Sequence, residues 1–204
     1  MKVLVQNLQK RNGLATQLFE EHHHPDVMLV QEINIYSETC NFTASNVSKR
    51  GYGTAIGSEF EMSNIKYVES PYAEVGGFIR KKTTIATIQS VQFVTFHGYN
   101  GQPFKDKDKL VAHVEAVLEK LTPGPALLAG DFNTWSKEHL DVVKDKMEGA
   151  GFHLAYSWPY GGRDFPLDHA FIRGLEMKQS ANYECASDHR GAILEFDDIV
   201  EASS

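Results

Sequence analysis

The sequence contains few cysteines, no long apolar run and no excess of basic residues. Its two cysteines, Cys40 and Cys185, are too few for a disulfide framework, and neither has a second cysteine at metal-ligand spacing. No apolar run approaches the roughly 20 residues that cross a bilayer, and residues 1–5 lead directly into polar positions without a signal-peptide pattern. We therefore expect free thiols, a cytoplasmic location, and no membrane or obligate protein partner.

The charge balance limits how the protein can bind nucleic acid. With a formal net charge of −7, the chain differs from duplex-binding modules, whose affinity depends on lysines and arginines that neutralise phosphates. A metal-dependent nuclease is compatible with this charge, because clustered carboxylates are balanced locally by bound cations. Basic residues gather at 49–50, 80–82 and 105–109, and such groups form a solvated face more often than a binding patch.

Length and composition predict one folded domain. The 204 residues, 42% hydrophobic and 23% charged, suffice for a buried core. The sequence has no internal repeat and no low-complexity linker. We expect a domain over residues 1–198 and a C-terminal tail over 199–204.

Residue patterns predict alternating strands and helices. Strands are expected at 2–6 and 27–31, around a helix over 14–23 that Pro25 helps to terminate. The segment 52–95 is rich in β-branched and aromatic residues, and turn signals at Gly57, Pro71 and Gly76-Gly77 divide it into antiparallel strands. Helices at 107–121 and 137–147 alternate with strands at 126–129, 152–156, 170–173 and 192–196. The pattern indicates an α/β or α+β domain with many antiparallel strands.

Four segments carry polar side chains of the types that active sites use. They are Val5-Gln6-Asn7, Leu29-Val30-Gln31-Glu32, Leu128-Ala129-Gly130-Asp131-Phe132-Asn133 and Ser187-Asp188-His189-Arg190. Strand ends and the loops beyond them are where an α/β scaffold displays its chemistry. The segments therefore predict one shared active-site rim.

Carboxylates dominate the candidate residues. Glu32, Asp131, Asp168 and Asp188 would together repel a phosphate group unless a cation intervened. Carboxylate and amide oxygens without thiolates suit Mg²⁺ or Mn²⁺. We therefore expect a hard divalent cation as cofactor.

Two pairs of residues have the chemistry of hydrolysis. Asp131 and Asn133 would face the same side of an extended loop, where the acid can orient a water and the amide can donate to a phosphoryl oxygen. The same residues suit an Asx turn, which is the simpler interpretation in isolation. His189 is the candidate general acid or base, with Asp168 fixing its tautomer and favouring the imidazolium.

Aromatic residues accompany these motifs. Trp135, Trp158 and Tyr160 could stack on bases near the rim, although aromatic residues in loops more often close an edge of the core. Arg163, in a glycine-containing loop before Asp168, is a candidate phosphate contact through its planar guanidinium.

The order of Asn7, Glu32, His97, Asp131 with Asn133, Asp168 and Asp188-His189 resembles that of the endonuclease/exonuclease/phosphatase superfamily. This DNase-I-like group includes exonuclease III, sphingomyelinases and inositol-polyphosphate phosphatases. Segments 167–174 and 187–190 are most similar to its small bacterial and phage members. The resemblance implies a four-layer α/β sandwich, with two packed mixed β-sheets flanked by helices on both outer faces.

The resemblance also implies how the residues divide the work. Glu32 would be the principal metal ligand, assisted by Asn7 and Asp188, while the Asp168–His189 pair would act on the attacking water.

His97 and Asn100 match the position where relatives hold the scissile phosphate, so the resemblance implies phosphate binding or protonation of the leaving group. No carboxylate partner for His97 is evident upstream, and Asn100 could equally cap the turn before Gly101.

These expectations predict a divalent-metal-dependent phosphodiesterase that hydrolyses DNA by in-line attack of activated water. A phosphatase or diesterase for a small or lipid-linked phosphate is an alternative, because the same site serves such relatives and loops set substrate choice. A non-catalytic binding protein on the same scaffold is a second alternative, which the full set of polar positions disfavours.

Overall fold

The computed structural model describes residues 1–11, 13–36, 39–74, 76–101, 105–163 and 165–197. The tail expected over 199–204 lies outside these residues. In chain order the elements are β1 (Lys2–Asn7), α1 (Leu14–Glu21), β2 (Val27–Ile33), β3 (Phe42–Asn46), β4 (Gly53–Ser58), β5 (Ser63–Glu69), β6 (Lys82–Ile88), β7 (Val91–His97), α2 (Lys107–Leu118), β8 (Ala126–Asp131), α3 (Lys137–Gly149), β9 (His153–Trp158), β10 (Asp168–Arg173), β11 (Met177–Tyr183) and β12 (Gly191–Phe196).

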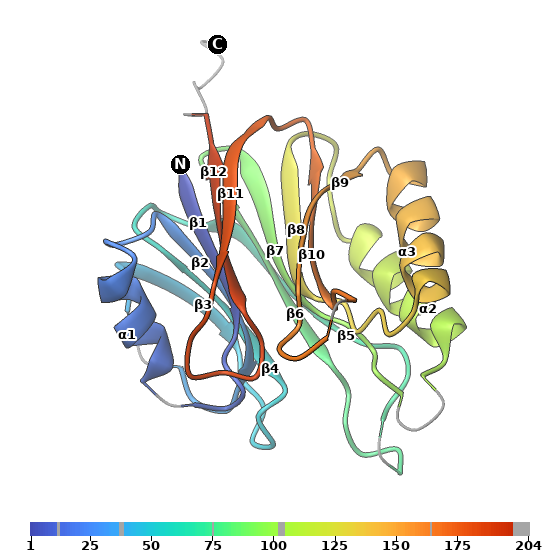
Figure 1. The fold of residues 1–204 in the computed structure, drawn as a ribbon. Coiled ribbons are helices and arrows are strands. Elements are labelled where there is room, and N and C mark those ends of the chain that lie inside the picture. Colours follow the sequence, from blue (N-terminus) through green and yellow to red (C-terminus); the bar gives the residue numbers. More distant parts are fainter. Residues whose placement is uncertain (12, 37–38, 75, 102–104, 164, 198–204) are drawn as a thin grey trace.

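The strands form two packed sheets (Figure 1). The first has the order β11-β12-β1-β2-β4-β3 and the second β5-β6-β7-β8-β10-β9. β1 pairs in parallel with β2, and β7 with β8, whereas the other neighbours are antiparallel. Helix α1 covers the outer face of the first sheet, and α2 and α3 cover that of the second. The expected four-layer sandwich of mixed sheets is therefore confirmed.

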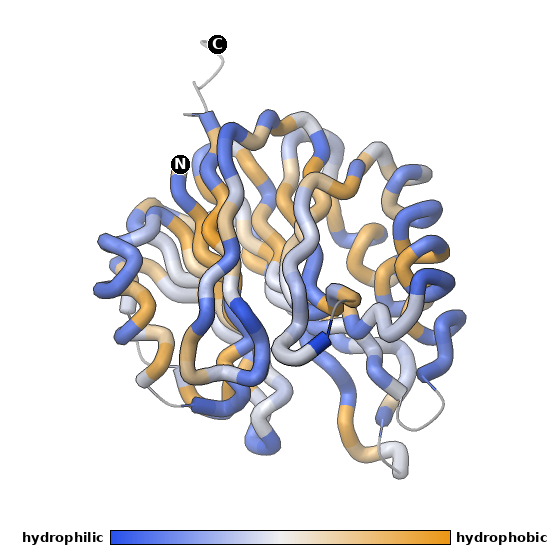
Figure 2. Tube along the Cα trace, in the orientation of Figure 1, coloured by the Kyte–Doolittle hydropathy of each residue, from blue (hydrophilic) through white to orange (hydrophobic). Residues whose placement is uncertain are grey.

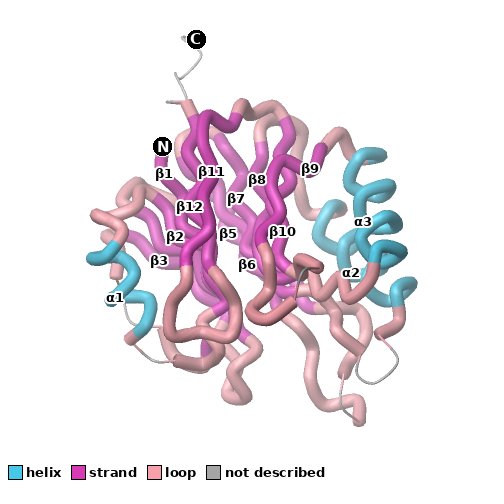
Figure 3. Tube along the Cα trace, viewed as in Figure 1, coloured by secondary structure: helices cyan, strands magenta, loops and turns pink. Residues whose placement is uncertain are grey.

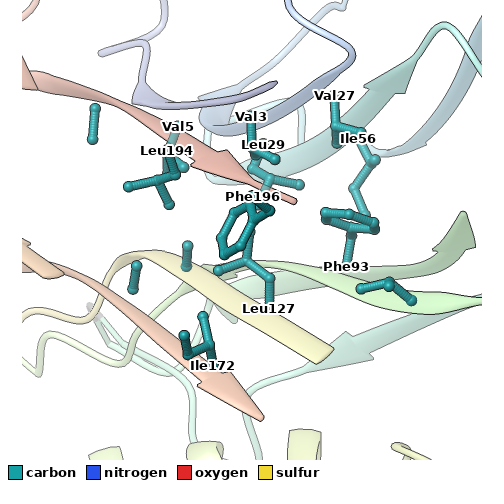
Figure 4. Packing of buried hydrophobic residues seen from close by; sticks show 14 of the residues in the cluster. Val3, Val5, Val27, Leu29, Ile56, Phe93, Leu127, Ile172, Leu194 and Phe196 are labelled. Carbon is teal, nitrogen blue, oxygen red and sulfur yellow. The ribbon is translucent and has the colours of Figure 1, made fainter. Parts of the chain in front are cut away.

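The largest apolar layer lies between the sheets (Figure 4). Val5 and Leu29 from the first sheet pack with Phe93, Leu127 and Ile172 from the second. Figure 2 shows the same arrangement along the chain, with apolar residues on the strands and hydrophilic residues on the outer sides of the helices. Burial of each large apolar side chain contributes about 1.5–3 kcal/mol. This layer therefore holds the two sheets in a fixed relation, which positions their strand ends.

Helices α2 and α3 begin at side-chain caps. Asp106 accepts hydrogen bonds from the backbone N–H groups of Asp108 and Lys109 at the start of α2, and the Ser136 hydroxyl accepts one from His139 at the start of α3. Helix α1 ends at Glu21, two residues before the predicted boundary, α2 ends three residues early, and α3 extends two residues further. No helix in the described ranges combines the length and apolarity needed to span a lipid bilayer.

The sequence patterns missed two strands and misassigned one glycine. β3 and β11 are edge strands of the first sheet, and much of each is partly exposed and polar, so neither shows a continuous apolar run. Gly57 was expected in a turn but lies inside β4, paired with Met28 and Thr43. A Cβ atom at Gly57 would come within 2.8 Å of the Cys40 sulfur, so this glycine permits close packing rather than a reversal of the chain.

His113 places an ionisable ring in the core under α2. It is fully buried against Phe96, and neither ring nitrogen has a hydrogen-bond partner among the described residues. Burial, followed by the charge of Lys81, lowers its pKa to about 3. An unfolded histidine titrates near 6.5, so protons bind preferentially to the unfolded chain below about pH 6.5.

We expect His113→Leu to weaken the acid sensitivity of folding. The stability that depends on neutral His113 is complete above about pH 6.5 and is lost towards pH 3, at about 1.4 kcal/mol per pH unit. Denaturant unfolding between pH 7 and pH 4 should therefore show a shallower decline for this variant. Replacement of His153, which is exposed, is the control. Equal slopes for wild type and His113→Leu would contradict this account.

Candidate active site

The candidate site lies where two parallel strand pairs end. Strands β1 and β2 end near Asn7 and Glu32, and β7 and β8 end at His97 and Asp131. Asp168 begins β10 directly opposite Asp131. Parallel strands end at one edge of a sheet, so these side chains meet at the end of the sandwich where the loops in Figure 3 gather, at the bottom of the view.

The interface between the sheets becomes polar near this edge. The Gln31 amide donates to the Thr95 hydroxyl at 2.8 Å, and the Thr54 and Thr84 hydroxyls are 2.8 Å apart. All four residues are fully buried. Buried hydrogen bonds of this kind require a particular alignment, so they fix how the site residues of one sheet face those of the other.

His189 and Asp168 form the shortest contact between predicted catalytic residues. The imidazole Nδ1 lies 2.8 Å from an Asp168 carboxylate oxygen, and Nε2 lies 3.8 Å from Asp131 Oδ2. Burial alone would lower the pKa of His189, but Asp168 and then Asp131 raise it to about 10. The structure therefore favours an imidazolium held between two buried carboxylates. The Tyr160 ring packs edge-on to the imidazole, with centroids 4.6 Å apart.

Asp131 and Asn133 form a turn that is also part of the site. Asp131 Oδ1 accepts from the Asn133 backbone N–H at 2.9 Å, which is an Asx turn, and Asn133 has a φ of 55°. The Asn133 amide donates to Asp131 Oδ2 at 3.3 Å and to the Gly98 carbonyl at 3.1 Å. The Asx turn expected as the simpler interpretation is therefore present. In this structure the amide supports Asp131, and Asn7 Nδ2 donates to the same carboxylate at 3.3 Å.

Burial raises the pKa of Asp131 to about 6, against the effect of His189 and with a further contribution from Asp168. A carboxylate in this condition can accept a proton near neutral pH. It is suited to orienting or deprotonating a water.

Glu32 reaches the site through a distorted strand. Its φ is 56°, and it sits where the pairing of β2 with β4 shifts between Gln31 and Ile33. Left-handed backbone at a non-glycine residue is a strained arrangement that persists where the surrounding structure enforces it. The carboxylate lies 3.7 Å from His97 Nε2 and is 20% exposed, compared with 3% for the Asp131 side chain. Burial raises its pKa, and Lys81 is the largest opposing influence.

Lys81 is a site residue that sequence reasoning missed. Its ammonium lies 2.6 Å from His97 Nε2, and the residue is only 3% exposed. The expectation that residues 80–82 form one solvated face is wrong at this position, because the three side chains separate. Arg80 donates to the carbonyls of Ser70 and Pro71, and Lys82 pairs with Glu69 at 2.5 Å. Three consecutive basic residues carry no sequence signal that shows which one is buried.

His97 therefore has a cation as its partner, where the sequence had offered no carboxylate. Burial and then Lys81 hold its pKa well below the usual range. Because an ammonium can only donate, the neutral imidazole accepts through Nε2 and carries its proton on Nδ1. Nε2 is thus not available as a proton donor in this structure. Of the two roles expected for His97, phosphate binding and protonation of the leaving group, this arrangement disfavours the second.

Asn100 and Arg163, both expected to bind phosphate, meet outside the buried cluster at Trp135. The indole N–H donates to Asn100 Oδ1 at 2.9 Å, and the Arg163 guanidinium lies 4.8 Å from the ring centroid. The Lys105 ammonium lies 3.1 Å from the same centroid. Tyr160 links this group to His189, since its ring also packs edge-on to Trp135 at 6.2 Å. We call Trp135, Lys105 and Arg163 the Trp135 cluster.

Asp188 and Trp158 differ in their placement. Asp188 is exposed, and its carboxylate accepts from the Tyr160 hydroxyl at 3.2 Å, apart from the buried acids. Trp158 is 1% exposed and donates to the Arg190 carbonyl at 3.0 Å, so it belongs to the core and not to the rim.

The donor atoms suit a hard cation. Among the described residues, Asp131, Asp168 and His189 form the one group of three potential ligands within 4.8 Å. A protonated imidazole cannot ligate a metal, so His189 fits acid–base work better. Glu32 is a largely buried carboxylate that lies 3.7 Å from the neutral His97 ring. Asn7 Oδ1 accepts only the Gln9 N–H among the described residues. These oxygens fit Mg²⁺ or Mn²⁺.

Sequence comparisons show which proteins the chain is similar to. A sequence model of the Endonuclease/Exonuclease/phosphatase family matches residues 5–189, from β1 to His189. A UPF0294 protein from Vibrio cholerae is 25% identical over 96% of this chain and 77% of its own length. A UPF0294 protein from Vibrio vulnificus is 43% identical over 36% of this chain, and the match spans only 28% of that relative.

Solved structures share the fold at low sequence identity. An endonuclease/exonuclease/phosphatase family protein from Leptotrichia buccalis has a TM-score of 0.76 at 16% identity, covering 97% of this chain and 99% of its own. A 3'-5' exonuclease from Neisseria meningitidis has a TM-score of 0.72 at 19% identity, with 97% and 100% covered. A mannosyl-6-phosphatase from Bacteroides thetaiotaomicron has a TM-score of 0.68 at 14% identity, with 96% and 99% covered. Given the family match across the whole site and these shared folds, the chain belongs to the Endonuclease/Exonuclease/phosphatase family of phosphoesterases.

Proposed function

We propose that this protein is a divalent-metal-dependent phosphodiesterase that hydrolyses DNA, in the cytoplasmic location expected from its sequence. The observation that carries the proposal is the buried arrangement of His189 between Asp168 and Asp131. Glu32 of the other sheet completes it, since Glu32 and Asp131 both lie 3.7 Å from His97 Nε2. Family enzymes are generally dependent on divalent metals, and the oxygen donors of this site suit Mg²⁺ or Mn²⁺.

The metal would be held by Glu32 with Asn7, and by Asp188 as the resemblance implies, and it would neutralise charge on phosphoryl oxygens. Asp131 would orient the attacking water and accept its proton, since burial raises the pKa of this carboxyl to about 6. The His189 imidazolium would donate to the phosphoryl group, held in place by Asp168.

The proposed metal dependence can be checked by activity and by binding. Purified protein should cleave plasmid or single-stranded DNA with Mg²⁺ or Mn²⁺ and lose this activity in excess chelator. Glu32→Gln removes the carboxylate proposed as the principal metal ligand, so it should weaken cation binding, measured by calorimetry, by at least tenfold. Glu61→Gln, at an exposed position between β4 and β5, is the control. Full activity in chelator would overturn the metal assignment.

The pairing of Asp168 with His189 predicts non-additive kinetics. His189→Ala and Asp168→Asn should each lower kcat about 10²–10⁴-fold, because acid–base assistance contributes that much. The double variant should lose little more than the worse single variant, since the two residues act as a unit. Steady-state rates of the three proteins decide this. A loss below tenfold for His189→Ala would remove it from the mechanism.

The Trp135 cluster favours a polyanionic substrate over a small phosphate ester. Lys105 and Arg163 approach the same indole, and within the described ranges neither has a carboxylate within 4.0 Å. Arg163 also lines a depression of about 400 Å³ together with Pro159, Tyr160, Gly162 and Arg190. Two unneutralised positive charges, linked to His189 through Trp135 and Tyr160, would be compensated by the phosphates that flank a scissile bond.

Neighbouring lysines are neutralised locally and provide a comparison. Lys107 pairs with Glu138, and Lys109 lies 3.3 Å from Asp106. Of the basic run at 105–109, only Lys105 therefore presents charge to the Trp135 cluster.

Salt dependence should distinguish the substrates. The double variant Lys105→Ala/Arg163→Ala should raise KM for DNA and reduce the slope of log KM against log salt by about two units, because about 0.9 counterions are released per phosphate contact. Hydrolysis of bis(p-nitrophenyl) phosphate should change little. Lys82→Ala/Lys107→Ala removes the same charge from ion-paired positions and is the control. Rapid turnover of a phosphomonoester or lipid phosphate, with DNA intact across metals and pH, would replace the nuclease assignment by that of a phosphatase.

A further inference from the structure

Lys81 is a buried cation without a carboxylate partner. The only hydrogen-bond partner of its ammonium in the described part of the chain is His97 Nε2 at 2.6 Å, and the ammonium lies 4.8 Å from the centroid of the Tyr52 ring. No described carboxylate comes within the 4.0 Å of an ion pair. A neutral imidazole and a ring face compensate little of the cost of burying an ammonium. Stability therefore does not explain why a lysine is buried at this position.

The contacts of Lys81 connect it to the buried acids of the site. His97 Nε2, its partner, lies 3.7 Å from both Glu32 Oε1 and Asp131 Oδ2. Lys81 is as deeply placed as Asp131, with 3% and 2% of their surfaces exposed. Lys10 approaches the same Tyr52 ring at 4.4 Å, so positive charge lines this side of the acidic cluster.

The hydrogen-bonding capacity of Lys81 exceeds what the protein uses. An ammonium has three N–H donors, and His97 accepts one of them. An acidic site that must admit a phosphate gains from fixed donors aimed where negative charge collects. Non-bridging phosphoryl oxygens are such acceptors.

We propose that Lys81 binds substrate directly, donating a hydrogen bond to a non-bridging oxygen of the scissile phosphate, and that His97 is the residue that positions it. This inference rests on the proposed phosphoester hydrolysis, and it assigns the substrate contact near His97 to the lysine instead of the histidine. His97 accepts from the ammonium and holds it close to the nitrogen that lies 3.7 Å from both Glu32 and Asp131.

The test compares Lys81→Met with Lys81→Ala and with wild type. Methionine matches the length of the lysine stem and removes the buried charge, so the melting temperature should stay the same or rise. Activity on DNA and on bis(p-nitrophenyl) phosphate should fall by about 10- to 100-fold, the range for a hydrogen bond to a charged group. Lys82→Ala, next in sequence and paired with Glu69, should stay within twofold of wild type.

Two further measurements separate substrate contact from a structural role. Methylammonium or ethylammonium should partly restore Lys81→Ala, in proportion to amine concentration, and should not restore His189→Ala. An oligonucleotide with one stereospecific phosphorothioate should slow wild type with one diastereomer, and that difference should shrink in Lys81→Met.

A binding experiment keeps this inference separate from the proposed function. Calorimetric titration with inorganic phosphate in the presence of Mg²⁺ should show at least tenfold weaker binding to Lys81→Met, and ¹⁵N spectra should show His97 as the Nδ1–H tautomer in wild type. If wild type hydrolyses no phosphoester, the proposed function fails, and the phosphate titration still decides on Lys81. A folded Lys81→Met that binds phosphate and turns over within threefold of wild type would overturn the inference.

Discussion

The arrangement of this molecule depends on how it accommodates the negative charge that its two sheets bring together. Asp131 and Asp168 face each other across β8 and β10 at 2% and 1% exposure, and Glu32 approaches from the first sheet. Carboxylates repel strongly where water is scarce, so ionised acids here require positive charge nearby. His189 supplies one charge against Asp168 and Asp131, and Lys81 supplies another beside His97. Glu32 is less well balanced, because its contact at 3.7 Å among the described residues is with the neutral His97 ring.

The packing of the two sheets holds these mutually repelling carboxylates in place. The apolar layer between the sheets fixes their separation, and the Gln31–Thr95 hydrogen bond fixes their alignment near the site. With that support, Glu32 and Asn133 adopt left-handed backbone at φ values of 56° and 55°. Such strain costs on the order of 1–3 kcal/mol per residue and persists only where the fold enforces it. The Glu32 and Asp131 carboxylates both lie 3.7 Å from His97 Nε2, so the packing of the core supports the geometry of the site.

Local charge is a better guide to substrate than net charge in this protein. The chain carries a formal charge of −7, and Lys82, Lys107 and Lys109 are matched with nearby acids. Lys105 and Arg163 nevertheless gather at Trp135, one aromatic contact away from Tyr160 and two from His189. The shared fold cannot choose between substrates, because similar structures include both an exonuclease and a mannosyl-6-phosphatase. Under the proposed function, loops such as those that carry the Trp135 cluster make this choice.

Local sequence determined the elements and most of the polar strand ends. Apolar runs that finish in Asn7, Glu32 and Asp131 predicted both the strands and the residues at their ends, because burial and strand periodicity are properties of neighbouring residues. The sequence patterns did not predict the edge strands β3 and β11, because half-exposed polar strands depend on a partner strand for their stability.

Only the tertiary structure decided which charges meet. In the folded chain Lys81, just before β6, contacts His97 at the end of β7. Asn100 and Arg163 both contact Trp135, and Asp188 accepts a hydrogen bond from Tyr160. Pairing, burial and the pKa values that follow from them are set by contacts between distant segments, and residue types in sequence do not specify those contacts.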